Sequence, residues 1–527
     1  MNKSGRPRAS KSGSWRRVSV AAVAAVVVAA TSAVTGSAST RADADPSAVT
    51  IDSGQIVGAV AEGHRSFRGI PYAAPPVGAL RWHAPEPPAP WTEPLDARTL
   101  PDACPQPDDP AQNEDCLKLN VITPLPVGRA GLPVVVWFHG GAFFRGAGGQ
   151  YDPARMAVAG DVVVVTVNYR LGALGFLADD ELGTTANFGL QDQIAALEWV
   201  RRNAAAFGGD PANVTAMGGS AGGLSICAHL SNGVAPELFS RAIIQSGPCA
   251  APFRTREQAR AESAALRAAL GCDGPDAAAC LRKAPADRVV RAQTGLTWSP
   301  TVGDQIVPRQ PADVFAEGGV APVDLLVGSN LDEGRFAVGM NHDGKGEPVT
   351  AEQYPRLVRE QYGAAADRVL QRYPLSGFET PSIALATVQT DYTSTFPPYS
   401  VCPVLWTEQQ ASRKNPVYAY EFADRTAPPP EVIPGFPSGA QHASELQYLF
   451  GYAGAGAPLD QTQRALGDLM IEYWTAFART GTPRAANGPE WPRFQSATDV
   501  LAFGDGGVRT VDLGQEHQCG FWREVTG

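Results

Sequence analysis

Six short runs of apolar residues recur along the chain, separated by longer stretches in which apolar and polar residues mix. They cover residues 133–138, 162–167, 214–217, 242–245, 324–328 and 417–422. Most of the runs are continuous rather than alternating, as expected for strands that are covered on both faces. The pattern therefore predicts buried strands of one sheet.

Helical spacing appears between and after these runs. In residues 190–207 apolar residues recur every three or four positions and Gly208 follows as a stop, and a similar pattern covers residues 466–477. Alternating strands and helices indicate a mainly parallel α/β sheet. We expect residues 250–320 and 345–400 to be mostly helical and loop insertions over one edge of the sheet rather than separate domains.

Composition excludes several classes of protein. The chain has 527 residues, of which 44% are hydrophobic and 18% charged, so it is too apolar for a disordered chain and long enough to bury a sizeable core. It carries 43 Lys and Arg against 53 Asp and Glu, and we find no basic cluster beyond the first 17 residues. Such a chain is not expected to bind nucleic acid.

The first 45 residues have the layout of a secretory signal peptide. Six basic residues come first, an apolar run of 13 residues follows, and small residues complete the segment. The run is shorter than the roughly 20 residues of a membrane-spanning helix. We expect cleavage after Ala38 or Ala44, a secreted protein without membrane insertion, and one mature domain over residues 46–527. The pair Arg16 and Arg17 leaves twin-arginine export open.

Export changes how charge and cysteines are interpreted. Removing residues 1–45 takes away seven basic and two acidic residues, so the net charge goes from −10 to −15 and strongly anionic substrates become less attractive at long range. The eight cysteines are an even number, and none of them has C-x-x-C or zinc-site spacing. We therefore expect structural disulfides, no metal and no cofactor.

A G-x-S-x-G motif covers residues 218–222, with Ser220 at its centre. The motif directly follows the strand predicted over 214–217 and precedes a helix-like stretch over 223–230. A sharp turn from strand to helix exposes a serine nucleophile and requires small neighbours. The five-residue pattern alone is weak evidence because glycine is frequent here, but this context makes Ser220 the candidate nucleophile.

A glycine loop follows the strand predicted over 133–138. Its sequence is His139-Gly140-Gly141-Ala142-Phe143. Small residues at this place let backbone N–H groups approach a substrate oxygen, as in an oxyanion hole.

The general base is sought among seven histidines. In the chain order Ser, acid, His it lies downstream of both Ser220 and an acid. His229 is nine residues from the serine on the same predicted helix, which is about 13 Å of rise and too far. His342 lies too close to any acid ahead of it. His442, in a loop after a predicted strand, fits this order, and His517 near the terminus stays open.

Two neighbouring carboxylates are candidates for the acid. Asp332 and Glu333 follow the strand predicted over 324–328, at its carboxyl end. The spacing alone does not decide between them.

These motifs, with others in the same order, resemble the type-B carboxylesterases, the family of bacterial p-nitrobenzyl esterases, animal carboxylesterases, fungal lipases and cholinesterases. The matching stretches are FRGIPYA (67–73), EDCLKLN (114–120), WFHGGAF (137–143), NYR (168–170), FGGDPANVTAMGGSAG (207–222), NLDEG (330–334), HASEL (442–446) and CGFW (519–522). The resemblance implies an α/β-hydrolase fold, with a large, mostly parallel central sheet flanked by helices and helical insertions over the active site.

The resemblance also implies roles for single residues. Ser220 is the nucleophile that forms an acyl-enzyme, His442 the general base and later acid, and Glu333 rather than Asp332 the carboxylate that orients the histidine. The oxyanion donors are the backbone N–H groups of Gly141, Ala142 and Ala221. The implied disulfides are Cys104–Cys116, Cys272–Cys280 and Cys402–Cys519, which leaves Cys227 and Cys249 as a further pair or as buried thiols.

Three departures from the family pattern bear on the site. Gly219 stands where the family usually has Glu beside the nucleophile, and Ala142 replaces a frequent third Gly. The loop from Cys104 to Cys116 lacks the aromatic residue with which cholinesterases bind quaternary ammonium groups. A choline ester is therefore not expected as the substrate.

We expect a secreted serine hydrolase acting on neutral carboxylic esters of small molecules. The alternatives are a true lipase acting on long-chain acylglycerols, a small hormone-sensitive-lipase-like esterase, and a non-catalytic adhesion protein on the same fold. Chain length and cysteine pattern disfavour the second, and the intact triad disfavours the third. The sequence carries no signal for an oligomeric state. Candidate pocket walls are Trp298, Phe336, Phe396 and Phe253.

Overall fold

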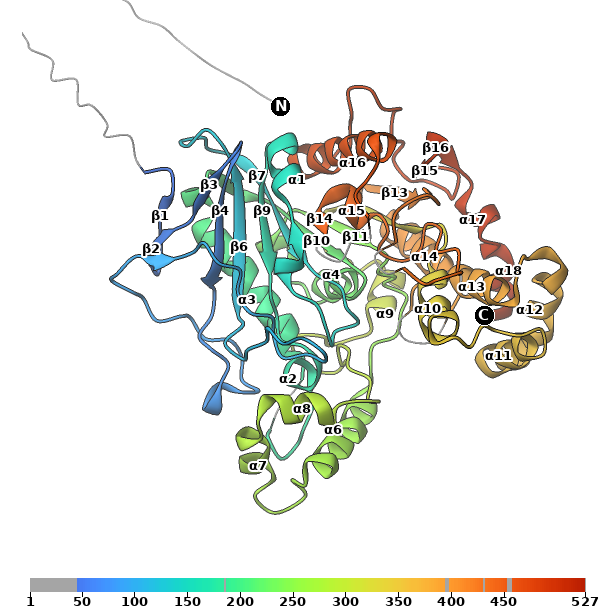
Figure 1. Cartoon of the computed structure of the whole chain (residues 1–527), viewed down its shortest axis with the longest axis horizontal. Coiled ribbons are helices and arrows are strands. Elements are labelled where there is room, and N and C mark those ends of the chain that lie inside the picture. The colour runs from blue at the N-terminus through green and yellow to red at the C-terminus, as the bar shows by residue number, and fades with distance from the viewer. Residues whose placement is uncertain (1–44, 184–185, 394–397, 430–431, 453–456, 527) are drawn as a thin grey trace, which may run out of the picture. The chain divides into compact units, whose positions relative to one another are not determined.

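The chain is built around an eleven-stranded sheet, seen near the middle of Figure 1. The computed structural model describes residues 45–526 except 184–185, 394–397, 430–431 and 453–456. The strands of the large sheet are β3 (Ala59–Ala61), β4 (His64–Pro71), β6 (Lys118–Pro124), β7 (Leu132–Phe138), β9 (Val163–Val167), β10 (Gly209–Gly219), β11 (Arg241–Gln245), β12 (Asp324–Asn330), β13 (Val417–Phe422), β15 (Val500–Gly504) and β16 (Gly507–Val511). Their order is β16-β15-β13-β12-β11-β10-β7-β9-β6-β4-β3.

The six predicted strands form the continuous middle of this sheet. In the order β13-β12-β11-β10-β7-β9 every neighbouring pair is parallel. The central parallel sheet predicted from the apolar runs is therefore confirmed. One boundary differs, because β10 begins at Gly209 and shifts register before Val214, so the strand is longer than its apolar part.

The edges of the sheet are antiparallel. β6, β4 and β3 pair antiparallel on one side and β16 pairs antiparallel with β15 on the other. None of these strands was predicted from the apolar runs: β4 and β6 mix polar and apolar residues, β3 has only three residues and β16 is largely exposed, while β15 is buried and apolar but was also missed. β1 (Ala48–Ile51), β2 (Gly54–Val57) and β5 (Leu95–Asp96) form a separate small sheet, and β8 (Tyr151–Asp152) pairs with β14 (Gly451–Tyr452).

Helices cover both faces of the large sheet. They are α1 (Ala154–Gly160), α2 (Gly172–Phe176), α3 (Phe188–Asn203), α4 (Ala221–Ser231), α5 (Ala235–Leu238), α6 (Arg256–Leu270), α7 (Ala277–Lys283), α8 (Ala286–Ala292), α9 (Pro311–Ala316), α10 (Gly334–Asn341), α11 (Gln353–Tyr362), α12 (Ala366–Arg372), α13 (Pro381–Asp391), α14 (Val401–Ala411), α15 (Leu446–Leu449), α16 (Gln461–Thr480), α17 (Leu513–Glu516) and α18 (Cys519–Thr526). The helices predicted over 190–207 and 466–477 are α3, continued by a short 3-10 turn, and the middle of α16.

Side chains of β7 show how the two faces are buried. Val134, Val136 and Phe138 point into the core shared with α3 and α4, whereas Val135 and Trp137 point into the core shared with α1 and α16. Successive side chains of a strand alternate between faces, so a strand covered on both sides is apolar throughout. This explains why the central strands read as continuous apolar runs.

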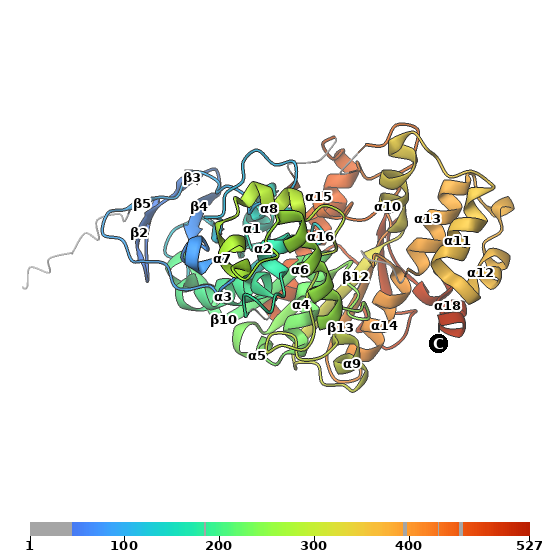
Figure 2. The same cartoon turned by 90° about the horizontal axis from the view of Figure 1, so that it is seen from below.

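The two predicted insertions are helical, as expected. Residues 250–320 contain α6 to α9 and residues 345–400 contain α11 to α13. Figures 1 and 2 both place α11, α12 and α13 at the end of this unit opposite β2 and β3.

All eight cysteines are paired in the structure. The bridges are Cys104–Cys116, Cys227–Cys249, Cys272–Cys280 and Cys402–Cys519. Three are the pairs that the family resemblance implies, and the fourth joins α4 to the segment after β11. The longest bridge separates its cysteines by 117 residues and ties α14 to α18.

The signal peptide expected in residues 1–45 lies almost wholly outside the described residues, which begin at Asp45. Within the described part of the chain, no helix has both the length and the apolar character needed to cross a membrane.

Candidate active site

Ser220 lies at the turn between β10 and α4, with φ 57° and ψ −120°. The chain can turn this sharply because small residues surround the serine and position 222 is a glycine: a Cβ on Gly222 would lie 2.0 Å from the carbonyl oxygen of Phe138. The Ser220 N–H donates to the carbonyl oxygen of Gln245 at 2.8 Å, which ties the turn to β11. This strained turn presents the serine to a cavity at the carboxyl end of the strands.

The two neighbouring carboxylates have different partners. Asp332 accepts hydrogen bonds from Arg425 at 2.8 and 3.0 Å and from the Ala440 N–H at 3.1 Å, and it forms an ion pair with Arg335 at 3.1 Å. These contacts fasten the loop that leads to the candidate histidine. Glu333 is fully buried and points to that histidine instead. The contacts in the structure thus distinguish the two carboxylates, which their positions in the sequence did not.

Glu333 is held from two sides. Its Oε2 lies 2.5 Å from Nδ1 of His442, while Oε1 accepts hydrogen bonds from Oγ of Ser246 at 2.5 Å and from the N–H of Asn330 at 2.9 Å. A carboxylate fixed in this way sets the orientation of the imidazole and stabilises its protonated form. The second ring nitrogen, Nε2, is then directed away from Glu333.

Ser246 was not singled out in the sequence. It directly follows β11, with φ 50°, and its N–H donates to the carbonyl oxygen of Gly328 at 2.8 Å. A signal was available, because a polar residue at the carboxyl end of a buried parallel strand lies at the edge where Ser220 and Glu333 also lie. The sequence gives no sign that the Ser246 hydroxyl reaches the carboxylate of Glu333.

The ring of His442 is stacked on an aromatic residue. Tyr399 lies parallel to it, with ring centroids 3.6 Å apart and planes inclined by 23°, and Phe336 lies 5.9 Å away. Burial raises the pKa of Tyr399 to about 12, so its hydroxyl is neutral at pH 7. Among the described residues, no hydrogen bond joins Ser220 Oγ to His442. Such bonds often form only when substrate binds.

The glycine loop runs directly against the candidate nucleophile. A Cβ on Gly140 would lie 3.0 Å from Cβ of Ser220. Gly141 and Ala142 have φ 107° and 51°, and the structure records no hydrogen-bond acceptor for their N–H groups within its described residues. The third expected donor, the N–H of Ala221, lies at the start of α4 directly after Ser220, so all three expected donors belong to segments next to the candidate nucleophile.

His139 at the start of this loop has a structural environment. Its ring stacks on Tyr169 at 4.4 Å, its Nδ1 lies 2.8 Å from the carbonyl oxygen of Gly140, and its own carbonyl accepts from the Tyr169 hydroxyl at 2.7 Å. Complete burial lowers the pKa of His139 to about 4, so the ring is neutral. The side chain braces the loop.

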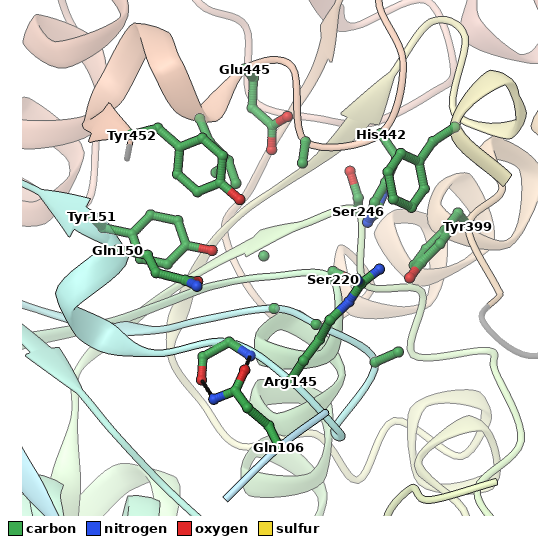
Figure 3. Close-up of a pocket in the computed structure, with 18 residues that line it drawn as sticks. Gln106, Arg145, Gln150, Tyr151, Ser220, Ser246, Tyr399, His442, Glu445 and Tyr452 are labelled. Atoms are coloured by element: carbon green, nitrogen blue, oxygen red, sulfur yellow. Dashed lines mark hydrogen bonds between the residues drawn. The ribbon is translucent and has the colours of Figure 1, made fainter. Parts of the chain in front are cut away.

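Ser220, His442 and the glycine loop line one cavity of about 250 Å³. In Figure 3, Tyr399 and His442 lie on one side of Ser220, Gln150, Tyr151 and Tyr452 lie on the other, and Gln106 and Arg145 lie below. Of the four candidate wall residues, Phe336 lines this cavity and Trp298 lines a separate hollow of about 550 Å³. Phe253 is buried in the core, and Phe396 falls outside the described residues.

A second carboxylate faces the same cavity. Glu445 accepts hydrogen bonds from Gln245 at 3.0 Å and from Asn330 at 2.8 Å. Burial, reinforced by the negative charge of Glu333, raises its pKa to about 7. Gly219, where the family usually has Glu, lines the cavity next to Trp137, and Glu445 lines it from the loop of His442.

The other candidate histidines lie elsewhere. His229 is buried on α4, with Nε2 2.8 Å from Oε1 of Gln193, and burial lowers its pKa to about 4. His517 is enclosed by Asp391 and Glu421, both at 2.7 Å. Of the two histidines left open by the sequence, only His442 lines the cavity with Ser220.

Several known proteins are similar to this chain in sequence and in fold. Residues 45–522 match the model of the carboxylesterase family. Para-nitrobenzyl esterase of Bacillus subtilis is 35% identical over 494 residues, which cover 85% of this chain and 93% of that protein. Phenmedipham hydrolase of Pseudarthrobacter oxydans is 34% identical, with 87% and 95% covered. A solved structure titled PNB esterase superposes with a TM-score of 0.75 at 32% identity and covers 90% of this chain and 100% of that one.

The family match spans most of the chain, and two relatives exceed 30% identity over most of their length. The central sheet and the helices around it agree with the esterase structures. The chain therefore belongs to the carboxylesterase family and is a carboxylic ester hydrolase of type B.

Proposed function

We propose that the protein is a secreted serine esterase that works through Ser220, His442 and Glu333 and an acyl-enzyme intermediate. The observation that supports this most strongly is the buried contact of 2.5 Å between Glu333 and Nδ1 of His442, on a histidine that shares its cavity with Ser220. Among the described residues, His442 is the one charged or chargeable partner of Glu333, and a buried carboxylate in such a contact orients the ring.

The proposed reaction begins with attack by Ser220 Oγ on the ester carbonyl carbon while Nε2 of His442 takes the hydroxyl proton. Negative charge develops on the carbonyl oxygen, where the N–H groups of Gly141, Ala142 and Ala221 would bind it. Each such donor contributes about 3 kcal/mol to the transition state.

Collapse of this intermediate breaks the bond to the alcohol oxygen, which receives the proton from His442. Water then attacks the acyl-enzyme by the same route, with His442 again as base. The acid product leaves and Ser220 regains its proton. Glu333 remains ionised throughout and stabilises the protonated imidazole.

The test replaces the nucleophile. Ser220→Ala is expected to lower kcat for 4-nitrophenyl hexanoate by at least about 10⁴-fold, because it removes the hydroxyl that is proposed to form the acyl-enzyme. A fluorophosphonate probe should label the wild type and leave the variant unlabelled. Ser231→Ala, on the same helix, is the matched control, since that hydroxyl only bonds the carbonyl oxygen of Cys227 at 2.7 Å. Retained turnover by Ser220→Ala would sink the proposal.

Export is the second part of the proposal. It is supported by the charged and apolar layout of residues 1–45 and by four disulfides, which persist outside the cytoplasm. N-terminal sequencing of protein from culture medium should begin after Ala38 or Ala44. An intact leader on active protein that stays in the cytoplasm would overturn this part.

A further inference from the structure

One cation, on an exposed side chain, lines the active-site cavity. Arg145 follows the glycine loop, and Figure 3 shows its side chain extending from below toward Ser220 and Tyr399. It is the only Lys or Arg among the described residues that line this cavity. Its positive charge acts on the hydroxyl of Tyr399, opposing the larger effect of burial, which raises the pKa of that hydroxyl.

The backbone of Arg145 is fixed by the oxyanion loop itself. The N–H groups of Phe144 and Arg145 both donate to the carbonyl oxygen of Gly141 at 3.1 Å. Because Gly141 has no side chain, the stem of Arg145 packs there, with Cγ 3.2 Å from the place a Cβ would occupy. The guanidinium carbon lies 5.5 Å from the ring centroid of Phe144. The side chain that carries the positive charge is thus anchored on the glycine loop, which faces the ester carbonyl in the proposed reaction.

The guanidinium has no anion of its own. In the described part of the chain, no carboxylate lies within 4 Å of it, in contrast to Arg425 and Arg335 beside Asp332. The two buried carboxylates of the site have other partners: Glu333 contacts Ser246 and His442, and Glu445 accepts from Gln245 and Asn330. A cation in a reaction cavity without a protein partner is available to a substrate.

We propose that Arg145 selects esters that carry, in addition to the ester group, a free and ionised carboxylate on the part of the substrate near the scissile bond. This inference rests on the proposed function and narrows its substrate class. A guanidinium binds a carboxylate through two parallel N–H donors, so the group would fix the orientation of the substrate as well as add affinity. The net charge of −15 that remains without residues 1–45 disfavours anions at long range, so the selection acts by contact.

The test uses pairs of esters in which one member carries a free carboxylate and the other does not. Mono-4-nitrophenyl adipate carries a carboxylate on the acyl side and 4-nitrophenyl hexanoate does not. 4-Carboxyphenyl hexanoate and phenyl hexanoate form the matching pair on the alcohol side. For the pair whose carboxylate reaches Arg145, the wild type should show a charged-to-neutral ratio of kcat/KM at least about tenfold above that of Arg145→Met.

Further variants separate contact from general charge. Arg145→Lys should keep part of the ratio, and Arg145→Glu should lower it below that of Arg145→Met. Arg356→Met is the control, since Arg356 is exposed on α11 and pairs with Glu360. For each variant at Arg145 and Arg356, kcat/KM on the neutral ester shows whether the site is intact. Ser220→Ala measures the background hydrolysis of the adipate ester.

Each outcome decides something. A ratio that falls in one pair assigns the carboxylate to the acyl or the alcohol side. Equal ratios for the wild type and Arg145→Met in both pairs overturn the inference while leaving the esterase proposal intact. Turnover of the neutral ester by Ser220→Ala would instead overturn the proposed function.

Discussion

Two buried histidines of this protein contact carboxylates, and their second nitrogens have different surroundings. His442 has one carboxylate partner, Glu333, and its ring borders the cavity of Ser220. His517, between α17 and α18, has two partners: Nδ1 lies 2.7 Å from Asp391 and Nε2 lies 2.7 Å from Glu421. Both histidines are at most 5% exposed.

This difference shows how a histidine that can act as a general base is distinguished from one that only stabilises the fold. Burial alone would lower the pKa of His517, but the hydrogen bonds and charges of its two carboxylates raise it to about 10, so the ring stays protonated at neutral pH and has no nitrogen left to accept a proton. A contact with a carboxylate is therefore no evidence of catalysis by itself. The informative feature is a ring nitrogen that faces the nucleophile.

The largest expected effect breaks the contact of His442. Glu333→Gln should lower kcat by about 10³- to 10⁴-fold because the amide no longer stabilises the charged imidazole. Asp332→Asn is the matched neighbour and should lose less than about tenfold, since it faces Arg425 and Arg335. Steady-state kinetics on one neutral ester measure both variants. A larger loss in Asp332→Asn would reassign the acid.

The next effect is on stability and concerns His517. His517→Gln removes the cation between Asp391 and Glu421, which should lower the free energy of unfolding by about 3 to 5 kcal/mol, as for other broken buried pairs. Folded enzyme should keep its kcat, because this cluster does not line the cavity. Urea unfolding measures the change, with His342→Gln as the control. Full stability together with lost turnover would refute the assignment as a brace.

The smallest effect is a dependence on pH. Because the folded pKa of His517 lies above its ordinary value of 6.5, its stabilisation is complete below about pH 6.5 and is lost as pH rises toward 10. The stability difference between wild type and His517→Gln should therefore shrink between pH 7 and 10. Nearby acids such as Glu516 remain in both proteins. A difference that stays constant over this range would contradict the raised pKa.

Much of the fold could be predicted because the central strands are buried on both faces. β7, β9 and β13 are apolar over nearly their whole length, and a signal of that kind survives without knowledge of neighbours. β4 and β16 were missed, since an edge strand mixes polar and apolar side chains and is identified by its partner rather than by its own sequence.

The same division applies to the site. Ser220 and the loop at Gly141 could be found because each lies at a fixed place relative to a predicted strand and requires small residues locally. Tyr399 and Arg145 could not be placed, because their contacts with His442 and with the cavity depend on how an insertion and a loop fold over the sheet. Side-chain direction in such segments is decided by tertiary packing.

The bridge between Cys402 and Cys519 has a consequence for biosynthesis. The segment it encloses contains His442, and its second cysteine follows the first by 117 residues. A chain cut short before residue 519 would carry the serine, the acid and the histidine yet leave Cys402 without its partner. Such a truncated product would expose an odd thiol to wrong pairing in an oxidising compartment. Covalent closure of the segment that contains His442 thus depends on the part of the chain that carries Cys519.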